Sequence, residues 1–240
     1  MPQTWQYIDS GPNIGAYNMA VDEELLARAQ AGEAMPVLRF YAWEPAAVSL
    51  GRFQNTKSSV NAEACRRLGF DIVRRVTGGR AVLHANELTY SIVARTDHAL
   101  FPQTVLGTYK VIAAGLVAGL RLLGLPAEMV TREDSHASLV QKHPKEASCF
   151  SSPSWYEIVV QGRKIAGSAQ RRAGGAFLQH GSILIGYDPQ LEAAVIPGEP
   201  TGERVTSIQH ELGRNVPAKE IKSAILSGFQ EALGIRFLQS

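Results

Sequence analysis

One cysteine and one lysine are the residues of this sequence best suited to covalent chemistry. Cys149 lies in the small, polar stretch 148–157, and Lys164 follows it just beyond Gln161-Gly162-Arg163, which is typical of a hairpin turn. A thiol is nucleophilic only as its thiolate, and a nearby cation lowers the pKa of the thiol. We therefore predict that Cys149 is a nucleophile and Lys164 its activator. Each residue alone also fits an ordinary role, as a buried thiol and a solvated turn lysine.

A second stretch, 74–84, could bind an anion or a polarised carbonyl group. It contains the pair Gly78-Gly79, and glycine lets a ligand approach the backbone closely and leaves amide N–H groups available to it. Guanidinium groups, which bind phosphate in a fork geometry, flank the pair at Arg74, Arg75 and Arg80. A plain hairpin turn with arginines that solvate its edge explains the same residues.

The pattern of apolar residues predicts one domain over residues 1–240. Strands are expected at 4–10, 36–41, 46–50, 70–75, 88–94, 156–160, 164–169 and 177–185. Helical spacing is found at 15–31, 61–69, 104–124 and 217–233. Turns are expected at 11–13 and 174–175, and loops at 131–147, with His136 and His143, and over most of 189–217, with one short helix. The predicted fold class is α/β (α+β), a mixed, largely antiparallel sheet flanked by helices.

The composition argues against several classes of function. The net charge of the 240 residues is +2, which gives no indication of nucleic-acid binding. We expect no membrane span, because no apolar run approaches the roughly 18–20 residues required, and no signal peptide. The histidines and the two cysteines lack metal-ligand spacing, so we expect no metal site. We also expect no cofactor. Two cysteines without an export signal favour the cytoplasm, and Cys65 is expected to be a buried helix residue.

Five motifs, in matching order, resemble the lipoate-protein ligase and octanoyltransferase superfamily. They are Arg-Arg-Val-Thr-Gly-Gly-Arg-Ala-Val-Leu-His (74–84), Leu-Thr-Tyr-Ser (88–91), Cys-Phe-Ser-Ser-Pro-Ser-Trp-Tyr-Glu (149–157), Gly-Arg-Lys-Ile-Ala-Gly-Ser-Ala-Gln (162–170) and Leu-Gln-His-Gly-Ser-Ile-Leu (178–184). The start Tyr-Asn-Met-Ala-Val-Asp (17–22) is also similar. The resemblance covers nearly the whole chain and is greatest to the cysteine-dependent octanoyltransferases of the LipM type.

The resemblance implies the fold of the catalytic domain shared by biotin and lipoate protein ligases. It implies transfer of an octanoyl group from octanoyl-acyl carrier protein to a lysine of a lipoyl domain, usually the H protein of the glycine cleavage system, in lipoate biosynthesis. Cys149 then corresponds to the acyl-accepting cysteine and Lys164 to the lysine that lowers the pKa of its thiol. The implied tunnel walls and substrate contacts are Arg75, Thr77, Gly78, Gly79, Ala81, Val82, His84, Gly167, Ser168, Ala169 and His180.

Within this set, two positions keep alternative interpretations open. His180 also fits a structural role, whereas His84 follows the glycine pair and could contact substrate. Backbone N–H groups near Gly78-Gly79 or Gly167-Ser168 are candidates for stabilising a developing oxyanion.

The sequence departs from its relatives at Ala85, where they usually have an aspartate directly after the histidine. The chain is also shorter at its C-terminus than is usual, with no room for an accessory domain. Three alternatives remain beside octanoyl transfer: an ATP-dependent lipoate-protein ligase, an amidotransferase that moves lipoyl or octanoyl groups between lipoyl domains, and an acyl-binding protein without catalysis. The cysteine motif argues against the first, and the retained pair of Cys149 and Lys164 argues against the last.

Overall fold

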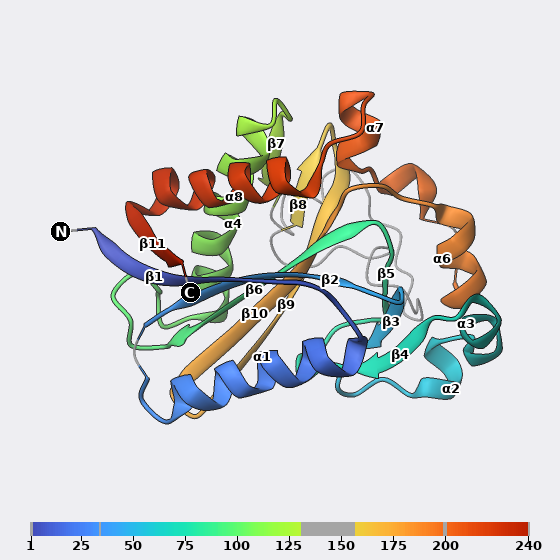
Figure 1. The fold of residues 1–240 in the computed structure, drawn as a ribbon, viewed down its shortest axis with the longest axis horizontal. Helices are drawn as coiled ribbons and strands as arrows, with labels where there is room; N and C mark the ends of the chain where they lie inside the picture. Colours follow the sequence, from blue (N-terminus) through green and yellow to red (C-terminus); the bar gives the residue numbers. More distant parts are fainter. Residues whose placement is uncertain (1, 34, 131–156, 199–200, 240) are drawn as a thin grey trace.

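The fold is built on an eight-stranded mixed sheet with helices on both faces, and a smaller three-stranded sheet lies beside one of these faces (Figure 1). The structure is a computed structural model, and it describes residues 2–33, 35–130, 157–198 and 201–239. The order of the large sheet is β11-β1-β2-β6-β10-β9-β8-β7, and the order of the small sheet is β4-β3-β5.

The strands of the large sheet come from both ends and the middle of the chain. Their bounds are β1 (Gln3–Asn13), β2 (Val37–Trp43), β6 (Glu87–Arg95), β7 (Ala127–Val130), β8 (Glu157–Val160), β9 (Arg163–Ala173), β10 (Ala176–Leu184) and β11 (Ile235–Gln239). The β1–β2 and β1–β11 pairs are parallel. The pairs from β2 through β6, β10, β9 and β8 to β7 are antiparallel. This arrangement confirms the predicted fold class.

One face of the large sheet is covered by two long helices, α4 (Val105–Leu122) and α8 (Ala218–Leu233), which pack on each other. Between these helices and the sheet lies the main core, which contains Trp5, Ile112 and Phe229. Helix α4 has a mean hydropathy of 1.5 over 18 residues and is long and apolar enough to cross a membrane by length and composition. The prediction that no apolar run approaches such a length is therefore wrong. Ile112, Leu116 and Leu120 of α4 are nevertheless buried in the main core, as in a packed core helix.

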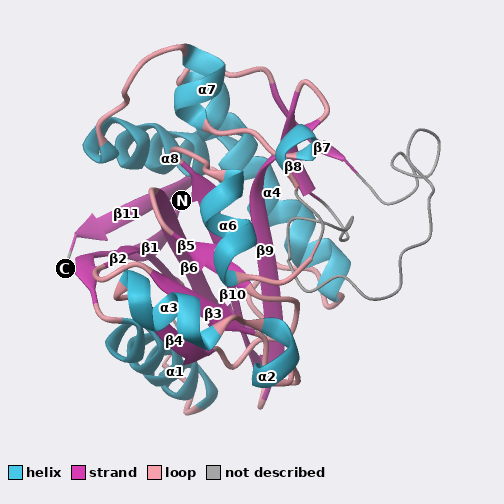
Figure 2. Cartoon of the chain, turned by 90° about the vertical axis from the view of Figure 1, so that its right-hand side faces the viewer, coloured by secondary structure: helices cyan, strands magenta, loops and turns pink. Residues whose placement is uncertain are grey.

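The opposite face carries α1 (Gly15–Gln30) and the small sheet, as the turned view also shows (Figure 2). The small sheet consists of β3 (Ala47–Leu50), β4 (Asp71–Arg74) and β5 (Val82–His84). Short helices accompany it: α2 (Thr56–Ser59), α3 (Ala62–Leu68) and α6 (Pro189–Val195). Cys65 of α3 is buried there, and burial raises the pKa of its thiol. This confirms the structural role expected for Cys65.

The hairpin between β8 and β9 forms where the sequence predicted it. Gln161 and Gly162 both have positive φ angles, 51° and 75°. Two central residues of this kind make the turn whose twist matches that of the flanking strands. The hairpin thus fixes where Lys164, the second residue of β9, lies.

Several elements differ from the prediction. Gly11-Pro12-Asn13 continues β1, with a shift of register between Asp9 and Pro12, and does not form a turn. Strands β7 and β11 were missed because both are short edge strands with little alternation of their own. The segment expected to hold one short helix contains α6, a 3-10 helix (Gly202–Arg204) and α7 (Ile208–Leu212). The predicted loop with His136 and His143 lies outside the described residues.

Candidate active site

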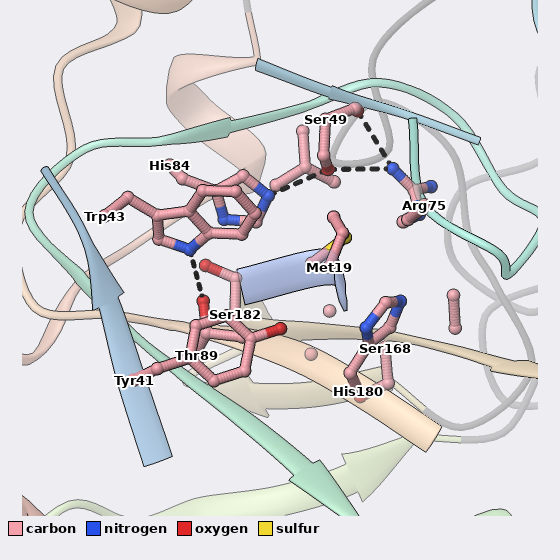
Figure 3. Close-up of a pocket in the computed structure, with 14 residues that line it drawn as sticks. Met19, Tyr41, Trp43, Ser49, Arg75, His84, Thr89, Ser168, His180 and Ser182 are labelled. Carbon is pink, nitrogen blue, oxygen red and sulfur yellow. Dashed lines mark hydrogen bonds between the residues drawn. The ribbon is translucent and has the colours of Figure 1, made fainter. Parts of the chain in front are cut away.

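A pocket lies between the large sheet, α1 and the small sheet, with about 420 Å³ of empty space (Figure 3). Its floor crosses four adjacent strands, β2, β6, β10 and β9, and its cover comes from α1 and the small sheet. The residues that line it are Met19, Tyr41, Trp43, Ser49, Arg75, Val82, His84, Thr89, Gly167, Ser168, Ala169, His180, Gly181 and Ser182.

The two ends of the pocket differ in composition. Figure 3 shows Trp43 and His84 at one end, and Ser168 and Arg75 at the other. The indole ring of Trp43 stacks on the imidazole of His84, with centroids 4.0 Å apart and planes 17° apart. Its Nε1 donates a hydrogen bond of 2.8 Å to Oγ1 of Thr89. This stack closes the end formed by β2.

Polar side chains in the wall are hydrogen-bonded to one another around one buried carboxylate. Thr89 donates to Oε1 of Glu87 at 2.7 Å, and Ser182 donates to Oε2 at 2.5 Å. Buried polar atoms that are satisfied in this way need no partner from a ligand. The wall therefore presents mainly carbon to the pocket, although serine and threonine contribute to it.

His84 combines burial with an unused ring nitrogen. Its Nε2 lies 2.8 Å from Oγ of Ser49, whereas Nδ1 lies 3.5 Å from Oε1 of Glu87 and makes no hydrogen bond to the described residues. Burial lowers the pKa of His84, and Glu87 offsets this in part. His84 is therefore neutral at physiological pH. Ala85, the residue after His84, lines a separate cavity together with Asn86.

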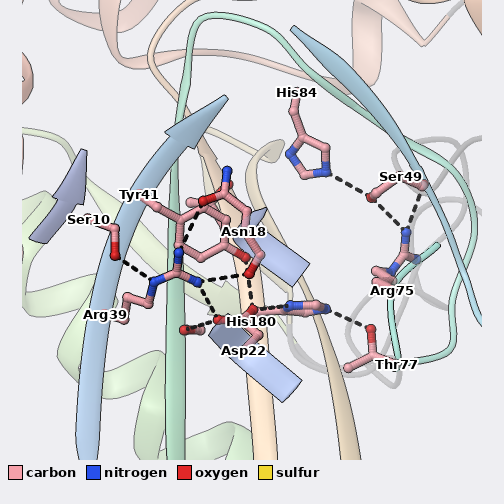
Figure 4. A network of polar contacts seen from close by, with 12 residues as sticks. Ser10, Asn18, Asp22, Arg39, Tyr41, Ser49, Arg75, Thr77, His84 and His180 are labelled. Carbon is pink, nitrogen blue, oxygen red and sulfur yellow. Dashed lines mark hydrogen bonds and ion pairs between the residues drawn. The ribbon is translucent and has the colours of Figure 1, made fainter. Parts of the chain in front are cut away.

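A second buried carboxylate, Asp22 of α1, organises the opposite side of the pocket (Figure 4). It pairs with Arg39 at 2.8 Å and accepts hydrogen bonds from Tyr41, Ser91 and the Nδ1 of His180. Burial raises the pKa of Asp22, but the hydrogen bond and charge of His180 and the charge of Arg39 outweigh it and hold the pKa below its usual value. Asp22 is therefore ionised, and its carboxylate holds the imidazole of His180 in place through Nδ1.

The glycine pair is held by the guanidinium group of Arg75. That group donates to the backbone oxygens of Ser49 at 2.9 Å, Gly78 at 2.9 Å and Arg80 at 2.6 Å. A methyl group on Gly51 would lie 2.0 Å from the carbonyl oxygen of Gly79, so these two backbones touch. Arg75 thus stabilises the conformation of the segment around Gly78 and Gly79 by donating to backbone carbonyl oxygens.

Lys164 is buried at 3% exposure, and its Nζ lies 2.5 Å from Oε1 of Glu157. Its direction follows from an irregularity in the β8–β9 pairing, where Ile158 faces Ala166 but Val159 faces Lys164. The extra residue, Ile165, is a β-bulge, and a bulge redirects the side chains beside it. Ile165 and Ala166 both enter the main core. Lys164 is therefore on the opposite face of the sheet, which is the face of the pocket.

The sequence matches known proteins over nearly its whole length. A family model described as the lipoyl protein ligase A/B catalytic domain matches residues 15–230. An octanoyltransferase LipM from Bacillus subtilis is 42% identical, over 97% of this chain and 87% of the relative. The chain belongs to the LipM octanoyltransferases of this family. Another LipM, from Kyrpidia tusciae, is 43% identical over 98% of the chain and 89% of the relative.

Solved structures of lipoate-protein ligases share the fold of this chain. Lipoate-protein ligase A bound with ATP superposes with a TM-score of 0.79 at 27% identity, covering 100% of this chain and 89% of that one. A bi-partite lipoate protein ligase from Thermoplasma acidophilum shares the fold, with a TM-score of 0.78 at 24% identity, covering 99% and 87%. As a LipM octanoyltransferase, the chain is an acyltransferase of lipoate biosynthesis.

The structure brings most of the predicted binding residues of the octanoyltransferase to one pocket. Those that line it are Arg75, Val82, His84, Gly167, Ser168, Ala169 and His180. Four others lie behind the lining: Thr77 contacts His180 at 2.7 Å, Gly78 and Gly79 border Arg75, and Ala81 packs in the small core under β3. Cys149 lies outside the described residues, so its predicted role stays a prediction.

Several residues of the site were missed by sequence reasoning. Trp43 and Glu87 lack any motif of their own, and the pattern gives no signal that they meet His84. Asp22 and Glu157 stand inside matched motifs, but the sequence does not show what they contact. Both could have been suspected, since each is an acidic residue in a motif otherwise rich in apolar or small residues.

Proposed function

We propose that this chain transfers an octanoyl group from octanoyl-acyl carrier protein to a lysine of a lipoyl domain, such as the glycine cleavage H protein, through a thioester on Cys149. The reaction runs in the cytoplasm and needs no cofactor. The observation that carries the proposal is the position of Lys164, a buried amine on the face of the sheet that holds an apolar pocket. A buried amine requires a charged partner, here Glu157, and buried charged groups beside a pocket are typical of functional sites.

The pocket suits an eight-carbon chain in the extent of its floor and in its mainly apolar lining. Four adjacent strands form its floor, and neighbouring strands are about 4.8 Å apart, so the floor is about 14 Å across. An extended chain of eight carbons is about 9 Å long, from C–C bonds of about 1.5 Å. Burial of its methylene groups contributes about 0.8 kcal/mol each. In the proposed orientation the carbonyl end lies near β9 and the methyl end points toward Trp43.

Acylation uses the ammonium form of Lys164. The Cys149 thiolate attacks the carrier thioester, a new C–S bond forms to the enzyme, and the C–S bond to the carrier breaks. Lys164 gives its proton to the departing carrier thiolate and is left as a neutral amine. The product is an enzyme thioester that keeps the reactivity of the donor.

Transfer to the acceptor reverses the charge on Lys164. The amine of the acceptor lysine attacks the enzyme thioester, and a C–N bond forms as the C–S bond to Cys149 breaks. The neutral amine of Lys164 takes the proton that the attacking nitrogen releases. The thiolate of Cys149 and the ammonium of Lys164 are restored together. Each half of the reaction thus prepares Lys164 for the other half.

An ATP-dependent lipoate-protein ligase is the second candidate, because an ATP-bound ligase has the same fold. The two are separated by incubating the enzyme and a lipoyl domain with octanoyl-carrier alone, or with octanoate and ATP. We expect octanoylation from the carrier without ATP, and none with Cys149→Ala or Cys149→Ser. Octanoylation by the Cys149→Ala protein, or octanoylation that requires ATP, would refute the proposal. The amidotransferase alternative predicts transfer from an octanoylated lipoyl domain instead of the carrier.

A further inference from the structure

Glu157 has no part in the reaction described above, although it is the last residue of the motif that contains Cys149. Its carboxylate oxygen Oε1 lies 2.5 Å from Nζ of Lys164, and the two side chains are 14% and 4% exposed. Ion pairs on the surface contribute little because water screens them, but this pair is largely removed from water. Removing one partner of such a buried pair leaves the other charge uncompensated and strongly lowers the free energy of unfolding.

The backbone holds the two side chains in this arrangement. On β8, Ile158 and Val160 enter the main core, so Glu157 and Val159 are on the opposite face. Lys164 is directly across from Val159 in the register of the hairpin. The backbone oxygen of Lys164 also accepts a hydrogen bond from the N–H of Thr206 at 2.9 Å. The pair is thus fixed by two neighbouring segments and does not depend on a flexible surface chain.

Arg163, the charged neighbour of Lys164 on β9, has different partners. Arg163 pairs with Glu211 of α7 at 2.7 Å and lies 3.1 Å from His210. Glu203 and Arg204 belong to the 3-10 helix that packs against β9. Among the described residues, Glu157 supplies the carboxylate bonded to Nζ of Lys164.

We propose that Glu157 is the positioning residue of Lys164, and that its carboxylate sets the pH at which Lys164 releases its proton. The proposal rests on the proposed function, in which Lys164 alternates between ammonium and amine. A carboxylate within hydrogen-bond distance stabilises the ammonium form. Glu157 therefore favours the first half of the reaction and makes the second half depend on pH. It also keeps Nζ on the pocket face during both halves.

The test uses the isosteric variant Glu157→Gln, which keeps the shape of the side chain and removes its charge. The first measurement is the NMR titration of the Lys164 side chain in protein labelled at lysine, with its signal assigned through Lys164→Arg. Loss of a partner charge at this distance is expected to lower the midpoint by about one to three pH units. Glu157→Asp should recover part of this shift, because it restores the charge.

The second measurement is the rate of transfer from preloaded octanoyl-enzyme to a lipoyl domain as a function of pH. In Glu157→Gln the pH of half-maximal rate should fall by the same amount as the titration midpoint. The matched control is Glu211→Gln, which removes a carboxylate from the neighbouring pair with Arg163. In that variant neither the midpoint nor the pH profile should move.

Two results would overturn the role of Glu157. One is a titration midpoint of Lys164 that stays within about 0.3 pH unit of the wild type in Glu157→Gln, because a nearby opposite charge typically shifts a pKa by about one unit or more. An equal shift of this midpoint in Glu211→Gln would count in the same way. The other is a shifted midpoint with an unchanged pH profile of transfer. If Glu157→Gln does not fold, Glu157→Asp must show the smaller shift in the same direction. A wild-type enzyme that never acquires an octanoyl group refutes the proposed function. The titration of Lys164 still tests the effect of Glu157 in that case, because it does not depend on acyl transfer.

Discussion

Nε2 of His180 lies 2.7 Å from the hydroxyl of Thr77, and both residues are buried. His180 is in turn held by Asp22 at 3.0 Å. A chain of carboxylate, imidazole and hydroxyl therefore connects α1, β10 and the glycine segment. Because His180 also lines the pocket, this chain ties the shape of one pocket wall to the position of the glycine pair.

Thr77→Val removes the hydroxyl and keeps the size of the side chain. A buried imidazole nitrogen left without a partner costs about 1–3 kcal/mol of the free energy of unfolding. We expect a loss of this size in urea unfolding, together with a higher KM for the octanoyl donor, because the wall beside His180 loosens. Thr77→Ser retains the hydroxyl and should keep most of the wild-type stability. Equal stability of Thr77→Val and the wild type would contradict the role of this hydrogen bond.

Trp43→Leu opens the end of the pocket that the Trp43–His84 stack closes. Each additional buried methylene contributes about 0.8 kcal/mol, so a longer acyl chain gains once there is room for it. We expect acylation from a twelve-carbon carrier to rise about tenfold or more relative to the eight-carbon carrier, for up to about 3 kcal/mol of added burial. Intact mass after incubation with each carrier measures this ratio.

Phe53→Leu is the matched control for Trp43→Leu, because Phe53 is an aromatic residue that is 86% exposed. Its preference for chain length should equal that of the wild type. If Trp43→Leu keeps the wild-type ratio of eight-carbon to twelve-carbon loading, the methyl end of the chain does not reach Trp43, and the proposed orientation in the pocket is wrong.

His84 makes the stability of the fold depend on pH below neutrality. Burial lowers its pKa below the usual value of 6.5, so the unfolded chain binds a proton that the folded chain does not. The stability that neutral His84 contributes is complete above about pH 6.5 and is lost as the pH falls through the folded-state pKa. We expect the urea concentration at the unfolding midpoint of the wild type to be lower at about pH 5.5 than at about pH 7.5. The decrease should be smaller in His84→Asn. An equal fall in both proteins would exclude His84 as the source.

The fold class could be predicted because its strands and helices carry their own signals. The β8–β9 turn is encoded locally by Gln161 and Gly162, and the amphipathic pattern of α8 by its own residues. Strand β11 could not be predicted in this way, because it is defined by parallel pairing with β1 at the other end of the chain. No local pattern specifies such a pairing.

The residues of the site also differ in whether the sequence could predict them. Gly167, Ser168 and His180 could be predicted, since they stand in motifs that match a family. Trp43 and Glu87 could not, because they join the site through contacts with His84 that depend on the packing of three different strands. The direction of Lys164 depends on a bulge at Ile165, and one inserted residue in a strand leaves no mark in the sequence pattern. What the sequence lacks is the register between strands, which settles which side chains meet.

The central claim is that Cys149 carries the octanoyl group between donor and acceptor. The most direct measurement is the intact mass of the enzyme after mixing with octanoyl-acyl carrier protein in the absence of ATP, followed by addition of a lipoyl domain. We predict that the wild-type mass rises by one octanoyl group, located on Cys149 by peptide mapping, and that the group moves to the lipoyl domain upon its addition. An enzyme whose mass never changes while the lipoyl domain becomes octanoylated, or a Cys149→Ala protein that is still acylated, would contradict the claim.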